Sequence, residues 1–118
     1  MDQKDIMEFN NYSNQMNMLN AQTMNLKGMI EKINENIDEL NKSKETHGYK
    51  NLGLVLIKKP KADLVKELED SKKSLDLRLK TIEKQEKIVS AKLEELKAKF
   101  ELEQKKQEKV TAEKKDKK

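Results

Sequence analysis

Few residues of this chain are of types that perform chemistry, and none stands in the pattern that catalysis or metal binding needs. His47 is the single histidine and there is no cysteine, whereas a zinc site takes three or four such ligands. The neighbouring acids Glu69-Asp70 and Glu94-Glu95 fall in heptad-type sequence, which favours solvated helix faces. A glycine-rich phosphate loop is also missing from the sequence. We therefore expect no enzyme, no metal and no cofactor.

The chemistry that remains is the burial of apolar surface, and the composition limits how it is arranged. Of 118 residues, 41% are charged and 34% are hydrophobic. Such a chain suits long helices with a narrow apolar seam, and one domain over residues 1–118 is expected. No apolar run could span a membrane, and the first residues do not resemble a signal peptide. We expect a cytoplasmic protein without membrane contacts.

A heptad pattern predicts a first long helix over residues 5–46. With Phe9 at position a, nine of ten a and d positions are apolar over five heptads, Thr23 being the exception. Three or four heptads are enough to identify a coiled coil. The a positions are Phe9, Met16, Thr23, Ile30 and Ile37, and the d positions are Tyr12, Leu19, Leu26, Ile33 and Leu40.

The same pattern resumes in a second helix predicted over residues 60–103. Pro60 suits its first turn, where a missing N–H costs nothing. Matched lengths predict antiparallel pairing of the two helices, which would bring the ends of the chain together. The a positions are Val65, Lys72, Leu79, Glu86, Leu93 and Phe100, and the d positions are Leu68, Leu75, Ile82, Val89, Leu96 and Glu103.

Residues 47–59, between the helices, are predicted to form a β-hairpin. Asn51-Leu52-Gly53 supplies the turn, with glycine available for a positive φ, and Leu54–Ile57 is expected as the second strand. A strand that is apolar on both faces needs cover on both, and a lone hairpin is marginal in water. We therefore predict that several hairpins join into a shared sheet or barrel. The apolar residues assigned to this assembly, termed the hairpin surface, are Tyr49, Leu52, Leu54, Val55, Leu56 and Ile57.

The last segment, residues 104–118, is rich in lysine. A frayed or disordered helix end is the simpler interpretation of these residues. A nucleic-acid contact is the alternative, and it would require affinity that falls steeply with salt.

Two stretches resemble prefoldin subunits of the beta type, both archaeal beta subunits and their eukaryotic subunit 6 counterparts. They are Tyr49–Lys58 (YKNLGLVLIK) and Leu75–Glu86 (LDLRLKTIEKQE), within a likeness that covers about residues 8–103. The resemblance implies a mainly α fold, in which an antiparallel two-helix coiled coil is hinged on one β-hairpin that joins an intersubunit β-barrel. It also implies a hexamer of two alpha and four beta subunits. Such a complex holds unfolded proteins at its coiled-coil tips and delivers them to a group II chaperonin without ATP.

The expected client-binding residues are the apolar and aromatic side chains near the shared end of the two helices. Methionine is adaptable and suits surfaces that accept many shapes. The alternative is that the aromatic residues only close the end of the coil. The residues assigned to client binding, termed the helix-end surface, are Ile6, Met7, Phe9, Tyr12, Met16, Met18, Leu96, Phe100 and Leu102.

A rival function belongs to a different class, that of a coiled-coil scaffold or tether that docks one specific protein. It predicts one tight ligand, whereas a holdase binds many denatured proteins weakly.

Overall fold

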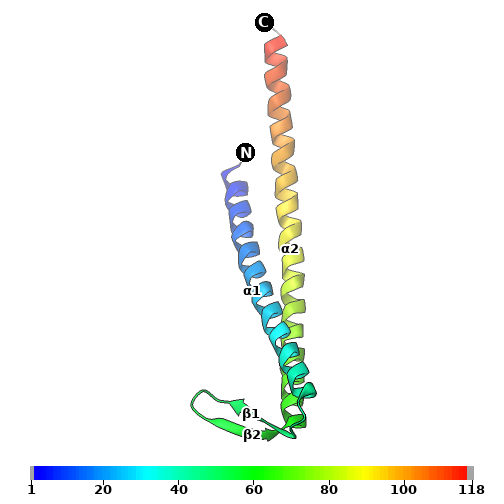
Figure 1. Ribbon diagram of the computed structural model, residues 1–118. Helices are drawn as coiled ribbons and strands as arrows, with labels where there is room; N and C mark the ends of the chain where they lie inside the picture. Colours follow the sequence, from blue (N-terminus) through cyan, green and yellow to red (C-terminus); the bar gives the residue numbers. More distant parts are fainter. Residues whose placement is uncertain (1, 117–118) are drawn as a thin grey trace. The chain divides into compact units, whose positions relative to one another are not determined.

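The computed structural model describes residues 2–116 of the chain, and the surroundings of side chains for residues 2–106. It contains two long helices joined through one β-hairpin (Figure 1). This confirms the predicted mainly α class with a single hairpin in the described residues; the joining of hairpins into a barrel stays a prediction. The elements are α1 (Gln3–Lys42), β1 (His47–Asn51), β2 (Leu56–Pro60) and α2 (Lys61–Asp116).

The predicted heptad register is confirmed on both helices. Every residue assigned to an a or d position is buried or half-buried, including the polar exceptions Lys72 and Glu86. Leu26, Val89 and Leu96 are among the most buried side chains. A repeat of 3.5 residues keeps one stripe of each helix on a single side, so a narrow seam is buried while most other positions stay exposed.

The chain divides into two compact units, and both helices contribute to each. The first unit contains the residues up to Ala21 together with those from Lys84 onward. The second contains Gln22–Glu83, and therefore the hairpin with the helix ends that flank it. The prediction of a single domain over the whole chain stays a prediction.

The first helix ends earlier than predicted, at Lys42 and not near residue 46. Ser43 still donates its N–H to the Glu39 carbonyl (3.1 Å), but its hydroxyl then accepts the N–H of Glu45 (3.2 Å). Serine bonds of this kind compete with helical hydrogen bonds and favour turns. The chain leaves the helix there, and Lys61 Nζ donates to the freed Ser43 carbonyl at 2.7 Å.

The second strand begins two residues later than predicted, at Leu56, and ends three residues later, at Pro60. Leu54 and Val55 are in the loop, because the N–H of Leu52 donates to the Val55 carbonyl (2.9 Å) and closes the turn. The positive φ predicted for Gly53 is confirmed, at 101°, and its N–H donates to Asn51 Oδ1 (2.9 Å).

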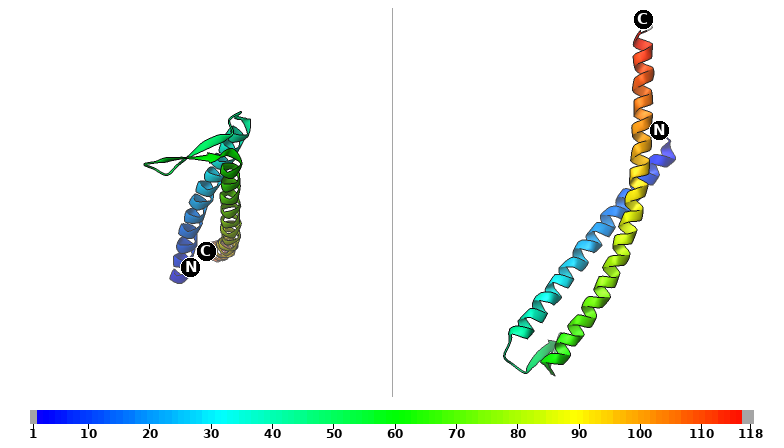
Figure 2. Two further views of the ribbon diagram at one scale, coloured as in Figure 1. Left: turned by 90° about the horizontal axis from the view of Figure 1, so that it is seen from below. Right: turned by 90° about the vertical axis from the view of Figure 1, so that its right-hand side faces the viewer.

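The strands pair antiparallel, with Tyr49 opposite Lys58 and Lys50 opposite Ile57. Pro60 pairs with His47 as the last strand residue, so α2 begins one residue later than predicted. Within the second unit the hairpin extends to one side of the adjoining helix ends, as Figures 1 and 2 show.

The second helix continues to Asp116, past its predicted end at residue 103. Lysine, glutamate and glutamine dominate this stretch, and all three are good helix formers. Residues 117–118, and the side chains beyond residue 106, lie outside the described residues. The nucleic-acid contact considered for this tail therefore stays a prediction.

Candidate functional site

All six residues of the hairpin surface are exposed in this chain. Leu54, at the loop, is fully exposed, and even the most covered of the six, Ile57, keeps 39% of its surface accessible. The outer edges of β1 and β2 have no strand neighbour among the described residues, since the sheet has two strands. Exposed apolar side chains beside unpaired strand edges form a surface suited to adding further strands.

The hairpin has two distinct faces, because residues directly opposite each other across an antiparallel pair project to the same side. Tyr49 and Lys58 share one face with Leu56. Lys50 and Lys59 lie on the other face, and both contact α2. The face of Lys50 and Lys59 therefore contacts α2 through Glu67. On the other face, Tyr49 lines a pocket together with Leu40 and Leu64 of the helices.

Gly48 allows the base of the hairpin to approach the helices closely. A Cβ atom at this position would lie 2.7 Å from Leu64 Cδ1 and 3.5 Å from Leu40 Cδ2. The first distance is shorter than a van der Waals contact, so any larger residue requires Leu64 to shift. Leu64 is itself buried, so the shift would disturb its packing.

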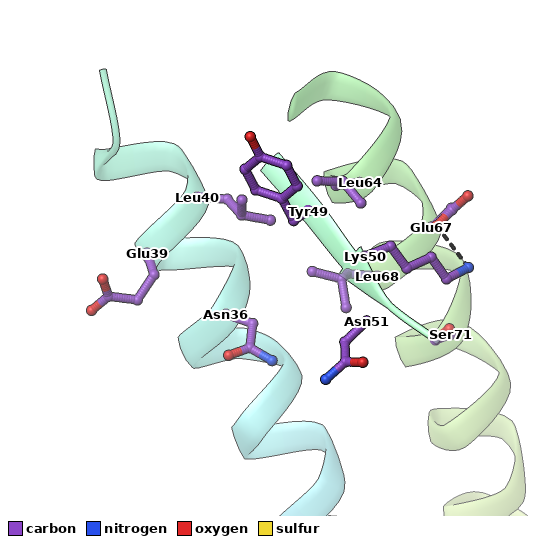
Figure 3. Close-up of a pocket in the computed structure, with 10 residues that line it drawn as sticks. All are labelled: Asn36, Glu39, Leu40, Tyr49, Lys50, Asn51, Leu64, Glu67, Leu68 and Ser71. Atoms are coloured by element: carbon purple, nitrogen blue, oxygen red, sulfur yellow. Dashed lines mark hydrogen bonds and ion pairs between the residues drawn. The ribbon is translucent and has the colours of Figure 1, made fainter. Parts of the chain in front are cut away.

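Glu67 connects both strands of the hairpin to α2. Its carboxylate accepts hydrogen bonds from Lys59 Nζ at 2.6 Å and from Lys50 Nζ at 3.2 Å. The bond from Lys59, followed by the bond from Lys50, lowers the pKa of Glu67 below its ordinary value of 4.5. The contact of Lys50 with Glu67 is drawn in Figure 3. We call these three side chains the hairpin brace.

A pocket of about 620 Å³ lies beside the brace, within the second unit. Leu40 on α1 and Leu64 and Leu68 on α2 line it, as the labelled side chains in Figure 3 show. Tyr49, Lys50 and Asn51 of β1 also line the pocket. Polar side chains, among them Asn36, Glu39 and Ser71, complete its lining, and it belongs to the region where the hairpin meets the helices.

In the first unit, two contacts join the beginning of α1 to α2. The rings of Phe9 and Phe100 meet edge to face with centroids 5.6 Å apart. Lys99 Nζ lies 2.8 Å from Asp5 Oδ2, and this hydrogen bond raises the pKa of Lys99 above its ordinary value. Asp5 lies one heptad before Tyr12, so it also occupies a d position, and it is buried. These contacts bring together residues that the antiparallel register predicted to be near each other.

The side chains of the helix-end surface are in part exposed, in part half-buried and in one case buried. Those outside the seam are exposed, and Met7, Met18 and Leu102 each keep at least 60% of their surface accessible. The seam aromatics are half-buried. Leu96 is buried, at 8% exposure, so it can meet a client only if the helices part. Ile6 is exposed, and the half-buried residues are Phe9, Tyr12, Met16 and Phe100.

Sequence reasoning missed one feature of this surface, the absence of charge along α1. No charged residue stands between Glu8 and Lys27, although 41% of the chain is charged. Within the first unit, the exposed side chains of this stretch up to Asn20 are amides and a methionine. An uncharged surface can be covered without desolvating ions, and the run of neutral residues was the signal that could have found it. The exposed residues concerned are Asn10, Asn11, Asn14, Gln15, Asn17, Met18 and Asn20.

The residues considered first for chemistry lie in exposed positions. His47 Nδ1 lies 2.9 Å from Thr46 Oγ1. Glu69, Asp70, Glu94 and Glu95 are all exposed on α2. In the described part of the chain, no group of three acidic, histidine or cysteine side chains is close enough to hold a metal ion. None of the helices described here carries an apolar stretch of the length that crossing a bilayer takes.

The fold and these two surfaces define a class of protein, a two-helix coiled-coil subunit that presents apolar surface on a hairpin and at a helix end. A family model described as prefoldin subunit matches residues 3–108. A prefoldin subunit beta of Saccharolobus islandicus is 33% identical over 99 residues, covering 83% of this chain and 79% of the relative. One from Archaeoglobus fulgidus is 32% identical over 73 residues, covering 61% and 63%.

A solved structure is also similar to this one. The crystal structure of the prefoldin beta subunit from Thermococcus strain KS-1 superposes with a TM-score of 0.77 at 26% identity, covering 82% of this chain and 86% of that one. The chain belongs to the prefoldin subunit family, as its resemblance predicted. Membership supports a chaperone-type role and assembly with other prefoldin subunits.

Proposed function

We propose that this chain is a beta-type subunit of a cytoplasmic, ATP-independent holdase. It binds unfolded proteins through the helix-end surface and assembles through the hairpin surface. The complex contains two alpha-type subunits and four beta-type subunits, and it delivers its clients to a group II chaperonin. Its action requires no catalysis, because it consists of reversible burial of the client's exposed apolar segments.

The observation that carries this proposal is the exposure of apolar side chains at both surfaces. Met7, Met18 and Leu102 are exposed in the unit that contains the ring contact of Phe9 with Phe100. Folded proteins rarely expose clustered apolar side chains without an interaction that covers them. Several such surfaces in one complex would add avidity to weak individual contacts.

Truncation separates the two roles. Removal of residues 1–12 and 97–118 takes away most of the helix-end surface and leaves the hairpin intact. The truncated chain is expected to assemble with its partners and to lose suppression of client aggregation. Unchanged suppression by the truncated complex would contradict client binding at the helix end.

The experiment also tests the rival function. A tether or scaffold predicts one tight, saturable protein ligand and no protection of unrelated denatured proteins. Protection of several unrelated clients at similar concentrations is the result expected for a holdase.

A further inference from the structure

We propose that Glu67 is a positioning residue for assembly, which fixes the direction in which the hairpin leaves the helices by binding Lys50 and Lys59 together. The inference rests on the proposed function, because it takes the hairpin as the element that joins neighbouring subunits. It adds a residue outside the hairpin, on α2, as a determinant of how readily that joining occurs.

The hairpin is otherwise attached to the helices at its base. There, Gly48 packs against Leu64 and Leu40, and the N–H of Lys61 donates to the Thr46 carbonyl at 3.0 Å. Beyond the base, the apolar residues from Tyr49 to Ile57 on both strands and in the loop are exposed. A ribbon held only at its base is free to tilt and to rotate about that attachment.

The brace adds an attachment from each strand, one at the base, where Lys59 lies opposite Gly48, and one at Lys50, two residues farther along β1. Lys50 comes from β1 and Lys59 from β2, and they bind different oxygens of one carboxylate, Oε2 and Oε1. Two contacts from separate strands to a single group, together with the base, restrict both tilt and rotation. Their geometry, more than their strength, therefore makes Glu67 suited to orienting the hairpin.

Exposed ion pairs are weak. A weak interaction is nevertheless enough to favour one orientation of the hairpin before the subunits associate. Glu67 keeps 41% of its side chain accessible, and Lys50 and Lys59 keep 44% and 32%. Pairs of this kind change an equilibrium only a few-fold each. Association, however, is opposed by the ordering of mobile segments, so a hairpin already held in one direction binds more readily.

Spin labels measure the orientation directly in the free subunit. The chain has no cysteine, so Leu54→Cys in the loop and Lys73→Cys on α2, both exposed, accept two labels. The distance distribution between them is expected to be narrow in the parent and broad in Glu67→Gln. Glu69→Gln, an exposed glutamate on the same helix, is the matched control and should leave the distribution narrow.

Assembly is then measured with unlabelled protein and an alpha-type prefoldin subunit. Glu67→Gln is expected to weaken assembly by about three- to tenfold, the range available to two exposed pairs. Glu67→Lys gathers three cations and should weaken it further. Addition of Lys59→Glu to Glu67→Lys restores an oppositely charged pair and should recover most of the loss, which a simple packing defect would not do.

The possible outcomes separate this inference from the proposed function. Assembly of Glu67→Gln and Glu67→Lys equal to that of the parent overturns the positioning role, whatever the label distances, and leaves the proposed function standing. Failure of the charge exchange to recover assembly also overturns it. Failure of the unaltered chain to assemble with any partner overturns the proposed function itself.

Discussion

The rings of Phe9 and Phe100 meet edge to face, with their centroids 5.6 Å apart and an interplanar angle of 64°. Aromatic pairs favour this arrangement because the positive edge of one ring faces the negative face of the other. The contact joins residues from opposite ends of the chain within the first unit. It therefore holds the beginning of α1 against α2 where the helix-end surface is exposed.

Replacement of Phe100 by alanine should loosen this contact. The loss of a half-buried ring and of its partner is expected to cost about 1–3 kcal/mol in the free energy of unfolding of the first unit. Hydrogen exchange of the first turns of α1 measures this local stability. Leu102→Ala, which removes an exposed side chain, should stay within about 0.5 kcal/mol of the parent. Equal effects of the two variants would contradict the assignment of the ring pair as the structural contact.

The stretch of α1 between Glu8 and Lys27, which contains no charged residue, gives a prediction about client binding. Gln15→Glu introduces one negative charge in that stretch, while Gln85→Glu makes the same change at an exposed position of α2 in the same unit. Both substitutions exchange the same residue types in a helix interior, directly before an a position, so the effects on helix propensity match. We expect Gln15→Glu to reduce the suppression of client aggregation several-fold, because a covered charge must be desolvated. Gln85→Glu should have little effect, and equal losses would contradict a client-binding role for this stretch.

The glycines give a contrast between open and crowded positions. Gly28 lies in α1 with nothing within 4 Å of an added Cβ, so Gly28→Ala should raise the free energy of unfolding by about 0.5–1 kcal/mol. Gly48→Ala places a Cβ against Leu64 and should lower it by about 1–3 kcal/mol. Thermal unfolding of both variants measures these changes. A stabilised Gly48→Ala chain would contradict the close approach of the hairpin to the helices.

The brace has a defined pH dependence. The pKa of Glu67 in the folded chain is lowered. The stabilisation that its bonds to Lys50 and Lys59 give the folded chain is therefore fully present above the unfolded pKa of about 4.5, and it is lost as pH falls through the folded pKa. The groups that face this carboxylate are Lys50 and Lys59. A carbon-detected NMR titration is expected to give Glu67 a pKa below 4.5, and Lys59→Met should move it back upward. The same pKa in parent and variant would contradict the brace.

Much of the fold follows from short-range sequence patterns. The heptad register was readable from residues such as Phe9, Leu26, Val89 and Leu96, because a 3.5-residue repeat places them on one stripe of the helix wherever the partner lies. The positive φ of Gly53 was predictable for a similar reason, since a tight turn needs a residue without a Cβ.

Other features depend on contacts between segments and could not be read in this way. Leu54 and Val55 look like strand residues by composition, yet the hydrogen bond from Leu52 to Val55 places them in the loop. The role of Gly48 depends on how closely the hairpin approaches Leu64. The pairing of Glu67 with Lys50 and Lys59 depends on the direction in which the hairpin leaves the helices, and no local pattern encodes that direction.

The exposed hairpin is the surface through which we expect this chain to assemble. Native mass spectrometry of this chain, alone and mixed with an alpha-type prefoldin subunit from the same source, measures that assembly. We expect a complex of two alpha-type subunits and four copies of this chain, formed only on mixing. A folded monomer that persists in the presence of its relatives would contradict the account.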